Sequence, residues 1–305
     1  MKKNILIAGS SGFIGKNLVE YFSSKVHVFA PSHAELELLD DNKVYDYIIR
    51  HNINIIIHAA SVGGLRGRAE NKEEVYFNLR IFFNLIKNFS RVQKIIFFGS
   101  GAEYDKSRPL VNISETDFGV NIPEDSYGFY KYVCSKYLEG ISVTRIINLR
   151  LFGVYGKYEN YFYRFISNAI VKNLLHLAID INQNVYFDYL YIDDLMKIVD
   201  YFIKNETKSN IYNTSSASRS DLITIAQRIN QISTYQSPII VRKKGFNNEY
   251  TASNDRLKRE IKDLRFTSLD AGIRSLYHWY KKRLNSVPID KIRQQQTDLT
   301  GTEGL

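Results

Sequence analysis

Residues 4–15, Asn4-Ile5-Leu6-Ile7-Ala8-Gly9-Ser10-Ser11-Gly12-Phe13-Ile14-Gly15, decide the fold. The apolar run that opens this stretch is typical of a buried strand, and a helical pattern begins at Phe13. The three glycines have the spacing of a loop that binds the pyrophosphate of a dinucleotide at a helix N-terminus. A turn that merely tolerates glycine is the alternative, and this position and spacing make it the weaker interpretation. The residues predicted to contact the dinucleotide are Gly9, Ser11, Gly12, Phe13, Ile14 and Gly15.

Strand and helix patterns alternate through the first half of the chain. Short apolar runs predict strands over 4–8, 26–29, 53–58, 94–98 and 144–149. Helical patterns fill the intervals over 13–23, 41–51, 73–89 and 126–140. We therefore predict an α/β fold, a Rossmann-type doubly wound parallel sheet with helices on both faces.

Beyond Leu151 the pattern becomes irregular, with helices expected near 161–173, 194–204, 221–231 and 269–283. These pieces predict a smaller C-terminal α/β lobe packed over the strand ends, where such folds bind ligands. The expected organisation is an NAD(P)-binding domain over 1–157 and a substrate-binding lobe over 158–286 that is interleaved with it. The polar composition of 287–305 predicts a disordered tail.

Composition narrows the class of protein. The 305 residues are 44% hydrophobic and 24% charged, which excludes collagen, coiled coil and wholesale disorder. The longest apolar runs are far shorter than the about 20 residues of a membrane span. A single cysteine, Cys134, indicates a reducing compartment, so a cytoplasmic protein is expected. The basic start followed by an apolar run could indicate a secretory signal, but the glycine loop explains it better.

The net charge of +9 favours anionic partners. No basic block exceeds three residues, and the 22 tyrosines and 18 phenylalanines are scattered at core-like spacing. A phosphorylated small molecule is therefore preferred to nucleic acid or a membrane surface. No metal site is predicted.

The segment after the second strand bears on the choice of dinucleotide. An acidic residue there would bind the ribose 2′-hydroxyl of NAD, but Phe29-Ala30-Pro31-Ser32-His33 contains none, and the first acid is Glu35. The missing carboxylate favours NADP(H). No arginine is present to hold a 2′-phosphate, so NAD(H) stays possible, with Ser32 and His33 as the ribose contacts in either case.

Tyr127 and Lys131 lie four residues apart near the start of a predicted helix, and residues at this spacing share a face. An ammonium group beside a phenol stabilises the phenolate, so Tyr127 is a candidate general acid or base for a carbonyl oxygen. A second pair, Tyr132 and Lys136, is rotated by about 140° and is assigned to packing. Ser100 ends the fourth strand and is predicted to orient the same oxygen from the edge of the sheet.

The combined motifs resemble those of the extended short-chain dehydrogenase/reductase superfamily. They are GSSGFIG at 9–15, His58-Ala59-Ala60, GSGAEY at 99–104, YGFYK at 127–131 and NLRLFGVYG at 148–156. The similarity covers residues 4–283 and is closest in pattern to the nucleotide-sugar enzymes, in particular the GDP-L-fucose synthase-like 4-keto sugar reductases. The resemblance implies a nucleotide-diphosphate sugar as substrate and a homodimer formed through the helices that bear Asn78 and Tyr127.

The resemblance also implies site residues. Ser100, Tyr127 and Lys131 would be catalytic. Asn78 would either lie near the substrate or bond backbone beside Ser100. The remaining implied cofactor contacts are His58, Ala59, Ala60, Ser61, Phe98, Lys131 and Phe152, and the implied substrate contacts are Val62, Gly63, Asn78, Ala102, Gly153, Tyr161, Arg219 and Arg256. Arg219 and Arg256 are included because Phe187 replaces the phosphate-binding arginine that is usual in these enzymes.

Departures from the superfamily pattern narrow the predicted chemistry. Members that dehydrate a sugar carry an acidic pair after the serine, where this chain has Gly101 and Ala102, and Glu103 comes one residue too late. Members that epimerise the ring use a cysteine and a histidine, whose places fall at Ala102 and about Tyr161. The favoured function is therefore NADPH-dependent reduction of the 4-keto group of a nucleotide-diphosphate-4-keto-6-deoxy sugar for surface polysaccharide. An NAD-dependent 4-epimerase and a catalytically inactive cofactor- or RNA-binding relative stay as alternatives.

Overall fold

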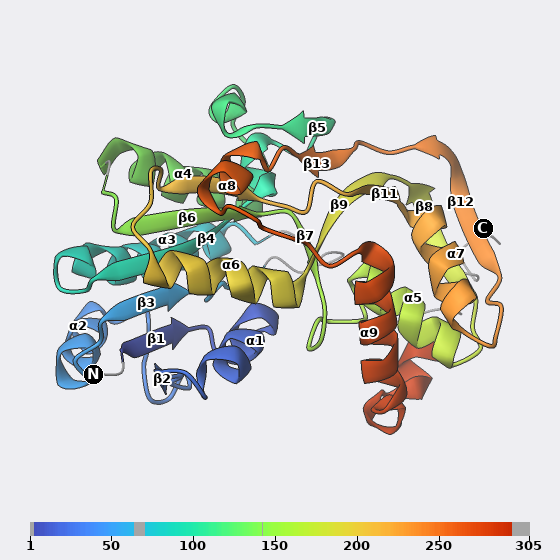
Figure 1. Ribbon diagram of the computed structural model, residues 1–305, viewed down its shortest axis with the longest axis horizontal. Coiled ribbons are helices and arrows are strands. Elements are labelled where there is room, and N and C mark those ends of the chain that lie inside the picture. The colour runs from blue at the N-terminus through green and yellow to red at the C-terminus, as the bar shows by residue number, and fades with distance from the viewer. Residues whose placement is uncertain (1–2, 64–70, 142, 295–305) are drawn as a thin grey trace.

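The computed structural model describes residues 3–63, 71–141 and 143–294. Its first lobe is built on a six-stranded parallel sheet with the order β10-β6-β4-β3-β1-β2 (Figure 1). The strands are β1 (Asn4–Ala8), β2 (His27–Phe29), β3 (Ile55–His58), β4 (Lys94–Ser100), β6 (Ile146–Leu151) and β10 (Ile211–Thr214). The predicted α/β fold with a doubly wound parallel sheet is confirmed.

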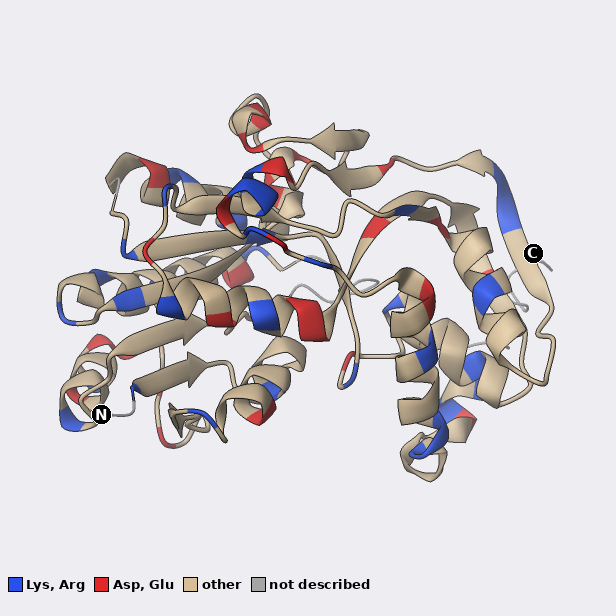
Figure 2. Ribbon diagram, in the orientation of Figure 1, with Lys and Arg blue, Asp and Glu red and all other residues tan. Residues whose placement is uncertain are grey.

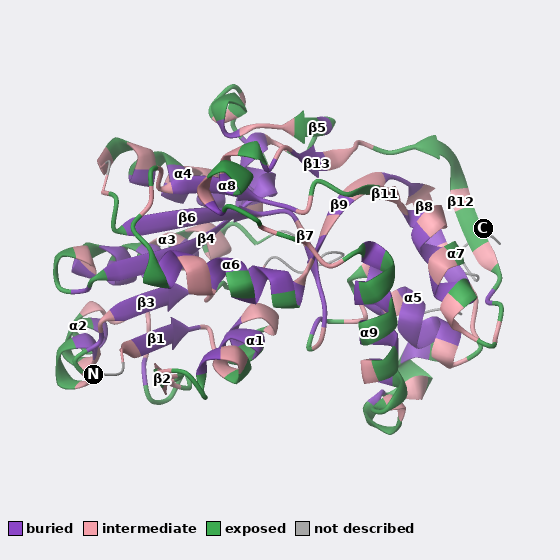
Figure 3. Ribbon diagram, viewed as in Figure 1, coloured by how far each residue is buried: buried purple, intermediate pink, exposed green. Residues whose placement is uncertain are grey.

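Helices cover both faces of this sheet, which is why its central strands are apolar along their whole length. In β1, Ile5 and Ile7 pack on one face and Leu6 and Ala8 on the other. The first face is covered by α1 (Phe13–Phe22) and α6 (Ile192–Lys204), and the second by α2 (Asp41–Arg50), α3 (Glu73–Ile86) and α4 (Ser126–Ile141). Figure 3 shows the buried strands between the more exposed helices.

The second lobe has short strands and its own apolar core. Helices α5 (Phe165–Leu174), α7 (Leu222–Ile232) and α9 (Leu269–Lys281) pack on one another there. One sheet joins β11 (Arg219–Asp221), β9 (Tyr186–Tyr191), β13 (Tyr250–Ala252) and β5 (Leu110–Ile113), with β7 (Gly153–Tyr155) beside β9. The remaining elements are β8 (Ile179–Asn184), β12 (Ile239–Phe246), α8 (Asp255–Glu260) and the 3-10 turns η1 (Lys87–Ser90), η2 (Gly101–Tyr104), η3 (Glu115–Asp117) and η4 (Leu284–Ser286).

The two lobes are interleaved along the chain. Helix α6 and strand β10 lie beyond residue 158 but complete the first lobe, and β5 lies before it but joins a sheet of the second. The expected disorder of the tail is wrong for 287–294. Residues 289–294 are helical, and Val287 and Ile292 are buried in the second-lobe core because their apolar side chains pack there. Residues 295–305 lie outside the described residues.

Charged side chains are spread over both lobes, with lysines and arginines interspersed among acids (Figure 2). This distribution agrees with the short basic blocks of the sequence. Among the helices of the described residues, none is both long and apolar enough to cross a membrane.

Candidate active site

The glycine loop joins β1 to α1 and leaves room for a ligand at one of its three glycines. A Cβ atom on Gly9, whose φ is +86°, would lie 2.5 Å from the backbone nitrogen of Ala60, and one on Gly15 would collide with the Gly9 carbonyl oxygen. A Cβ on Gly12 would meet nothing closer than 3.4 Å. Gly12 is also the N-cap of α1, where no described side chain forms a capping hydrogen bond. Open space beside an uncapped helix N-terminus fits the pyrophosphate of a dinucleotide.

The segment after β2 approaches this loop, because the Ser10 hydroxyl donates to the carbonyl oxygens of Ala30 and Pro31 at 3.3 and 3.4 Å. Ser32 donates from its backbone N–H and its hydroxyl to one carboxylate oxygen of Glu35, at 2.7 and 2.8 Å. These hydrogen bonds, led by the backbone one, hold the pKa of the Glu35 carboxyl below its usual value. An anionic group therefore lies near the segment where the ribose of the dinucleotide is expected, although Glu35 is several residues beyond the end of β2, where the acidic residue of NAD-binding folds usually stands.

His58 ends β3 and lies in the wall of the cavity described below. Its side chain is almost fully buried, and burial, with a smaller contribution from the charge of Lys131, lowers its pKa to about 3. The imidazole is therefore neutral at physiological pH. Among the described residues, Nδ1 of His58 has no hydrogen-bond partner. An unsatisfied buried nitrogen at this point is a further feature that fits a polar ligand.

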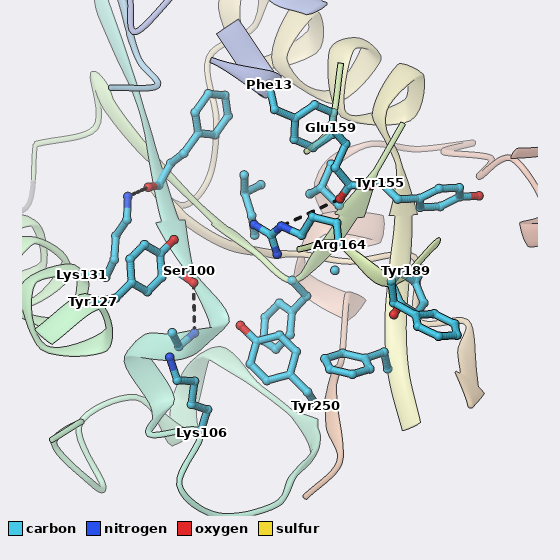
Figure 4. Close-up of a pocket in the computed structure, with 18 of the residues that line it drawn as sticks. Phe13, Ser100, Lys106, Tyr127, Lys131, Tyr155, Glu159, Arg164, Tyr189 and Tyr250 are labelled. Carbon is cyan, nitrogen blue, oxygen red and sulfur yellow. Dashed lines mark hydrogen bonds and ion pairs between the residues drawn. The ribbon is translucent and has the colours of Figure 1, made fainter. Parts of the chain in front are cut away.

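A cavity of about 810 Å³ brings most of the predicted site residues together. This volume is within the usual range for small-molecule sites. The sequence-predicted residues that line it are Phe13, Ile14, His58, Ala59, Ala60, Ser61, Phe98, Ser100, Ala102, Tyr127, Lys131, Phe152 and Gly153. Residues of the second lobe, such as Tyr155, Arg164 and Tyr189, line the opposite side (Figure 4).

Ser100, Tyr127 and Lys131 share one wall of this cavity. Figure 4 shows the hydroxyl groups of Tyr127 and Ser100 turned toward the same space, with Lys131 beside them. Ser100 ends β4, and its Oγ accepts a hydrogen bond from the Ala102 N–H at 3.1 Å, so its own hydrogen is directed elsewhere. Nζ of Lys131 donates to the Phe98 carbonyl oxygen at 2.5 Å. A carbonyl oxygen in this space could accept one hydrogen bond from Ser100 and a proton from Tyr127.

The start of α4 fixes the position of Tyr127. The carboxylate of Asp125 accepts a hydrogen bond from the Gly128 N–H at 3.0 Å and so caps the helix. A Cβ on Gly128 would lie 2.8 Å from the Ala102 carbonyl oxygen. Gly128 therefore allows α4 to approach η2 closely. Tyr132, the other candidate tyrosine, packs against the ring of Phe118 instead, with 5.0 Å between ring centres.

Glu103 is directed away from the cavity, as its one-residue displacement predicts. Its side chain is fully buried, and its Oε2 lies 2.9 Å from Nε of Arg150. Its other oxygen accepts the backbone N–H of Ser100 at 2.6 Å. Glu103 therefore holds the backbone of Ser100 and does not reach the space in front of Tyr127.

Comparison with known proteins assigns a family. Residues 5–215, more than half of the chain, match the NAD dependent epimerase/dehydratase family. The chain belongs to this family. It is 26% identical to the GDP-L-colitose synthase of Yersinia pseudotuberculosis over 231 residues. The aligned region covers 67% of this chain and 73% of the synthase. It is also 25% identical to the GDP-L-fucose synthase of Dictyostelium discoideum over 313 residues. That aligned region covers 92% of this chain and 95% of the synthase.

Solved structures of low identity share the fold. A GDP-D-glycero-L-gluco-heptose synthase from Campylobacter jejuni superposes with a TM-score of 0.80 at 18% identity, over 92% of this chain and 98% of that one. The family match confirms the resemblance inferred from the sequence motifs. It places this epimerase/dehydratase-family protein among NAD(P)-dependent enzymes that modify nucleotide sugars.

Two arginines that the sequence analysis expected to contact substrate do not line the cavity. Arg219 forms two hydrogen bonds with the carboxylate of Glu249, at 3.0 and 2.9 Å. Arg256 donates to the Ile211 carbonyl oxygen at 3.2 Å and lies 3.7 Å from a carboxylate oxygen of Glu115. Both charges are therefore held by protein groups that are remote in sequence.

Asn78 and Tyr161 also lie outside the cavity. Asn78 is buried and holds the loop after β3, because its amide exchanges two hydrogen bonds of 2.9 Å with the backbone of Val62. The alternative that Asn78 bonds backbone beside Ser100 is wrong. Tyr161 packs in the second lobe against Phe162, with ring centres 4.8 Å apart, since its aromatic ring extends the apolar core there.

Eight other predicted contacts are not in the lining of the cavity: Gly9, Ser11, Gly12 and Gly15 of the glycine loop, and Ser32, His33, Val62 and Gly63. Ser32 and His33 follow β2 at the surface, where the His33 ring pairs with Glu37 at 3.1 Å. Val62 and Gly63 continue from Ser61, and Gly63 has a φ of +74°. These positions are compatible with contact to an extended ligand that passes the cavity rim.

The sequence analysis missed the polar and aromatic residues on the second-lobe side. Lys106, Asp125, Glu159 and Arg164 all line the cavity. So do the side chains Tyr155, Asn182, Gln183, Phe187, Tyr189, Asn247, Asn248, Glu249 and Tyr250. The available signal was weak: aromatic and amide residues cluster near 182–189 and 247–250, but no spacing rule directs them to one cavity.

Proposed function

We propose that this protein reduces the 4-keto group of a nucleotide-diphosphate-linked 4-keto-6-deoxy sugar with NADPH. The observation that carries the proposal is the wall on which Ser100 and Tyr127 face one space while Ala102, beside them, offers no ionisable group. An alcohol product that stays linked to its nucleotide is an activated sugar, the form that synthesis of a surface polysaccharide consumes.

The proposed mechanism assigns one task to each residue. Tyr127 gives its proton to the oxygen at C4, and Ser100 donates a hydrogen bond that orients this oxygen. Lys131 stabilises the phenolate that Tyr127 becomes, from the next turn of the same helix. When bound, NADPH supplies the hydride. The neutral, buried His58 and the apolar side chains of Phe98 and Phe152 keep water from this end of the cavity.

Four carboxylates of the described residues line the cavity, and three of them, all but Glu74, are bound by protein donors, which supports reduction without dehydration or ring epimerisation. Asp125 accepts from Lys106 and from Gly128. Glu159 accepts from the Ser167 hydroxyl at 2.6 Å, and Glu249 accepts from Arg219 and Thr251. Each of these three groups already serves a protein donor, so none is a ready base for a sugar carbon.

A second candidate function is an NAD-dependent 4-epimerase, which Glu35 favours. A carboxylate bonded to Ser32 would accept a hydrogen bond from a ribose 2′-hydroxyl and would repel a 2′-phosphate. NADPH remains the first choice, because the heptose synthase with the same fold was solved in the presence of NADPH. An inactive relative is disfavoured, since Ser100, Tyr127 and Lys131 are all present at one wall.

The test uses the whole protein with NADPH or NADH and a panel of GDP-, CDP-, dTDP- and UDP-4-keto-6-deoxy sugars. Loss of absorbance at the nicotinamide band with one of these sugars supports reduction. In a parallel assay with NAD⁺ and nucleotide hexoses, interconversion of the hexoses without net consumption of the cofactor would support the epimerase and contradict reduction. With the accepted sugar, Tyr127→Phe should lose turnover by about 1,000-fold while NADPH binds as before. Near-normal turnover of this variant would reject Tyr127 as the proton donor.

The proposal includes a homodimer formed through α3 and α4. These two helices pack on each other and expose the aromatic side chains of Tyr76, Phe83, Phe129 and Tyr137. Clustered exposed aromatic residues are typical of an interface between protein chains. Light scattering on the purified protein should give twice the chain mass, and a monomer at micromolar concentration would contradict the dimer.

A further inference from the structure

The cavity is lined by few cationic side chains, and these differ in how they are bound. Among the described lining residues they are Lys106, Lys131 and Arg164. Lys131 donates to a backbone carbonyl oxygen, and Lys106 forms a 2.9 Å hydrogen bond with Asp125. For Arg164, the nearest carboxylate oxygen is 3.9 Å from Nε, which is beyond hydrogen-bonding distance. Arg164 is therefore the cation whose N–H donors are least used by the protein.

Arg164 also has the most central position. It immediately precedes α5, and its side chain is 49% exposed. Figure 4 shows its guanidinium group projecting into the cavity, with Ser100 and Tyr127 on one side and Tyr189 on the other. The far side is aromatic and rich in amides, since Phe187, Tyr189 and Tyr250 line it together with the amide residues Asn182, Gln183, Asn247 and Asn248.

A nucleotide-diphosphate sugar has three parts in a fixed order, and the cavity offers a matching order. The reacting sugar belongs beside Ser100 and Tyr127. Aromatic rings and amide side chains suit the base, which needs stacking and hydrogen bonds at its edge. The diphosphate lies between sugar and base, which is where Arg164 projects.

We propose that Arg164 binds the diphosphate of the substrate and is its principal cationic anchor among the residues that the structure describes. This inference rests on the proposed function. A guanidinium group presents paired N–H donors that match phosphate oxygens, and such charge-assisted bonds are strong. Arg219 and Arg256 do not compete for this role, because both lie outside the cavity and are bound to Glu249 and Glu115.

Glu159 positions the arginine without consuming its donors. Its side chain is 5% exposed, and one of its oxygens accepts the Ser167 hydroxyl at 2.6 Å. The carboxylate is thereby fixed behind Arg164, which it attracts through charge across 3.9 Å. At this separation the guanidinium keeps donors for a phosphate, whereas a tight bidentate pair such as Arg219–Glu249 would not.

The test measures binding by calorimetry in protein saturated with NADPH, so that the cofactor's own phosphates are already in place. The probes are GDP, UDP, CDP and dTDP, each with its monophosphate. Arg164→Gln should weaken the preferred diphosphate by about 30-fold, and Arg164→Lys by less. It should also shrink the preference for diphosphate over monophosphate, a difference that a general loss of packing would not alter selectively.

Arg228→Gln is the matched control, since Arg228 pairs with Asp270 and neither residue lines the cavity; its diphosphate affinity should stay within twofold of wild type. Unchanged NADPH affinity in all variants shows that they fold. If the affinity of Arg164→Gln for the preferred diphosphate is within threefold of that of wild type, the role of Arg164 as anchor is contradicted, whereas the proposed function is unaffected. If none of the four diphosphates binds the wild-type protein, the anchor and the nucleotide-sugar substrate are both overturned.

Discussion

On the first-lobe wall of the cavity, Ser100 and Lys131 are buried, and each is bonded to backbone, Ser100 to the Ala102 N–H and Lys131 to the Phe98 carbonyl oxygen. On the second-lobe wall, the Arg164 side chain is half exposed, and its Nε lies 3.9 Å from a carboxylate oxygen of Glu159. Ser100 ends β4 and Lys131 lies on α4, whereas Arg164 lies in the loop that precedes α5. Under the proposed function, the difference teaches that the residues assigned to proton transfer lie on regular elements of the first lobe, whereas the residue assigned to the diphosphate lies on a loop of the second.

After Tyr127→Phe, the largest loss of activity expected from a change in the first-lobe wall comes from Ser100→Ala. The hydroxyl is held in place by the Ala102 N–H, and in the proposed mechanism it would donate to the oxygen that Tyr127 would protonate. Its removal should lower kcat about 100-fold, as for the loss of one preorganised donor, with NADPH affinity unchanged. Single-turnover kinetics with the accepted keto sugar measure this. A kcat within threefold of wild type would contradict a rigid, preorganised first wall.

Substitutions at two glycines of the loop between β1 and α1 should have different effects, one on stability and the other on cofactor binding. Gly15→Ala forces a methyl group against the Gly9 carbonyl oxygen and should lower the free energy of unfolding by about 2–3 kcal/mol. Gly12→Ala makes only an ordinary contact, 3.4 Å from the Gly9 carbonyl oxygen, so its stability should stay within about 0.5 kcal/mol. Its NADPH affinity should nevertheless fall, because the added methyl group occupies the pyrophosphate site. Urea denaturation and fluorescence titration measure the two effects, and the reverse pattern would reject this assignment.

The stability of the first lobe should depend on pH through His58. Its folded-state pKa is lowered to about 3 from an ordinary value of 6.5. Below pH 6.5, His58 is protonated in the unfolded chain but stays neutral in the folded protein. The free energy of unfolding therefore falls as the pH falls toward 3. Between pH 7 and pH 5 the loss should be about 2 kcal/mol from this residue. Urea denaturation of wild type and His58→Gln tests it: the variant should lose about 2 kcal/mol less, and equal losses would exclude His58.

A smaller effect is expected at the surface end of the cofactor site. Glu35→Gln removes the negative charge that is bonded to Ser32. The ratio of kcat/KM for NADPH to that for NADH should rise about fivefold, since repulsion against a 2′-phosphate is screened at an exposed site. An unchanged ratio would mean that Glu35 does not face the ribose.

Sequence reasoning reached the first lobe because its rules are local. A glycine loop after a strand, a serine at a strand end and a tyrosine–lysine pair on one helix face are each defined within a few residues. Parallel topology then brings those strand ends to one edge, and Ser100, Tyr127 and Lys131 line one cavity as expected. His58 follows the same rule, because it ends β3 beside β4.

The second lobe was less accessible to prediction because its contacts join distant segments. Arg219 was expected in the site, but it pairs with Glu249, thirty residues away. Arg164 has no pattern around it that indicates a cavity, and only the packing of α5 brings it there. The predicted disorder of 287–294 was wrong for a related reason: the polar composition of the segment hides two apolar residues, Val287 and Ile292, that are buried in the second-lobe core.

The most direct measurement is a crystal structure of the protein with NADP⁺ and the accepted nucleotide sugar. The oxygen at C4 should lie about 2.6–3.2 Å from both the Tyr127 hydroxyl and Oγ of Ser100, with C4 facing the nicotinamide. A C4 oxygen remote from Tyr127, with another side chain in its place, would contradict the assignment of Tyr127 as the proton donor.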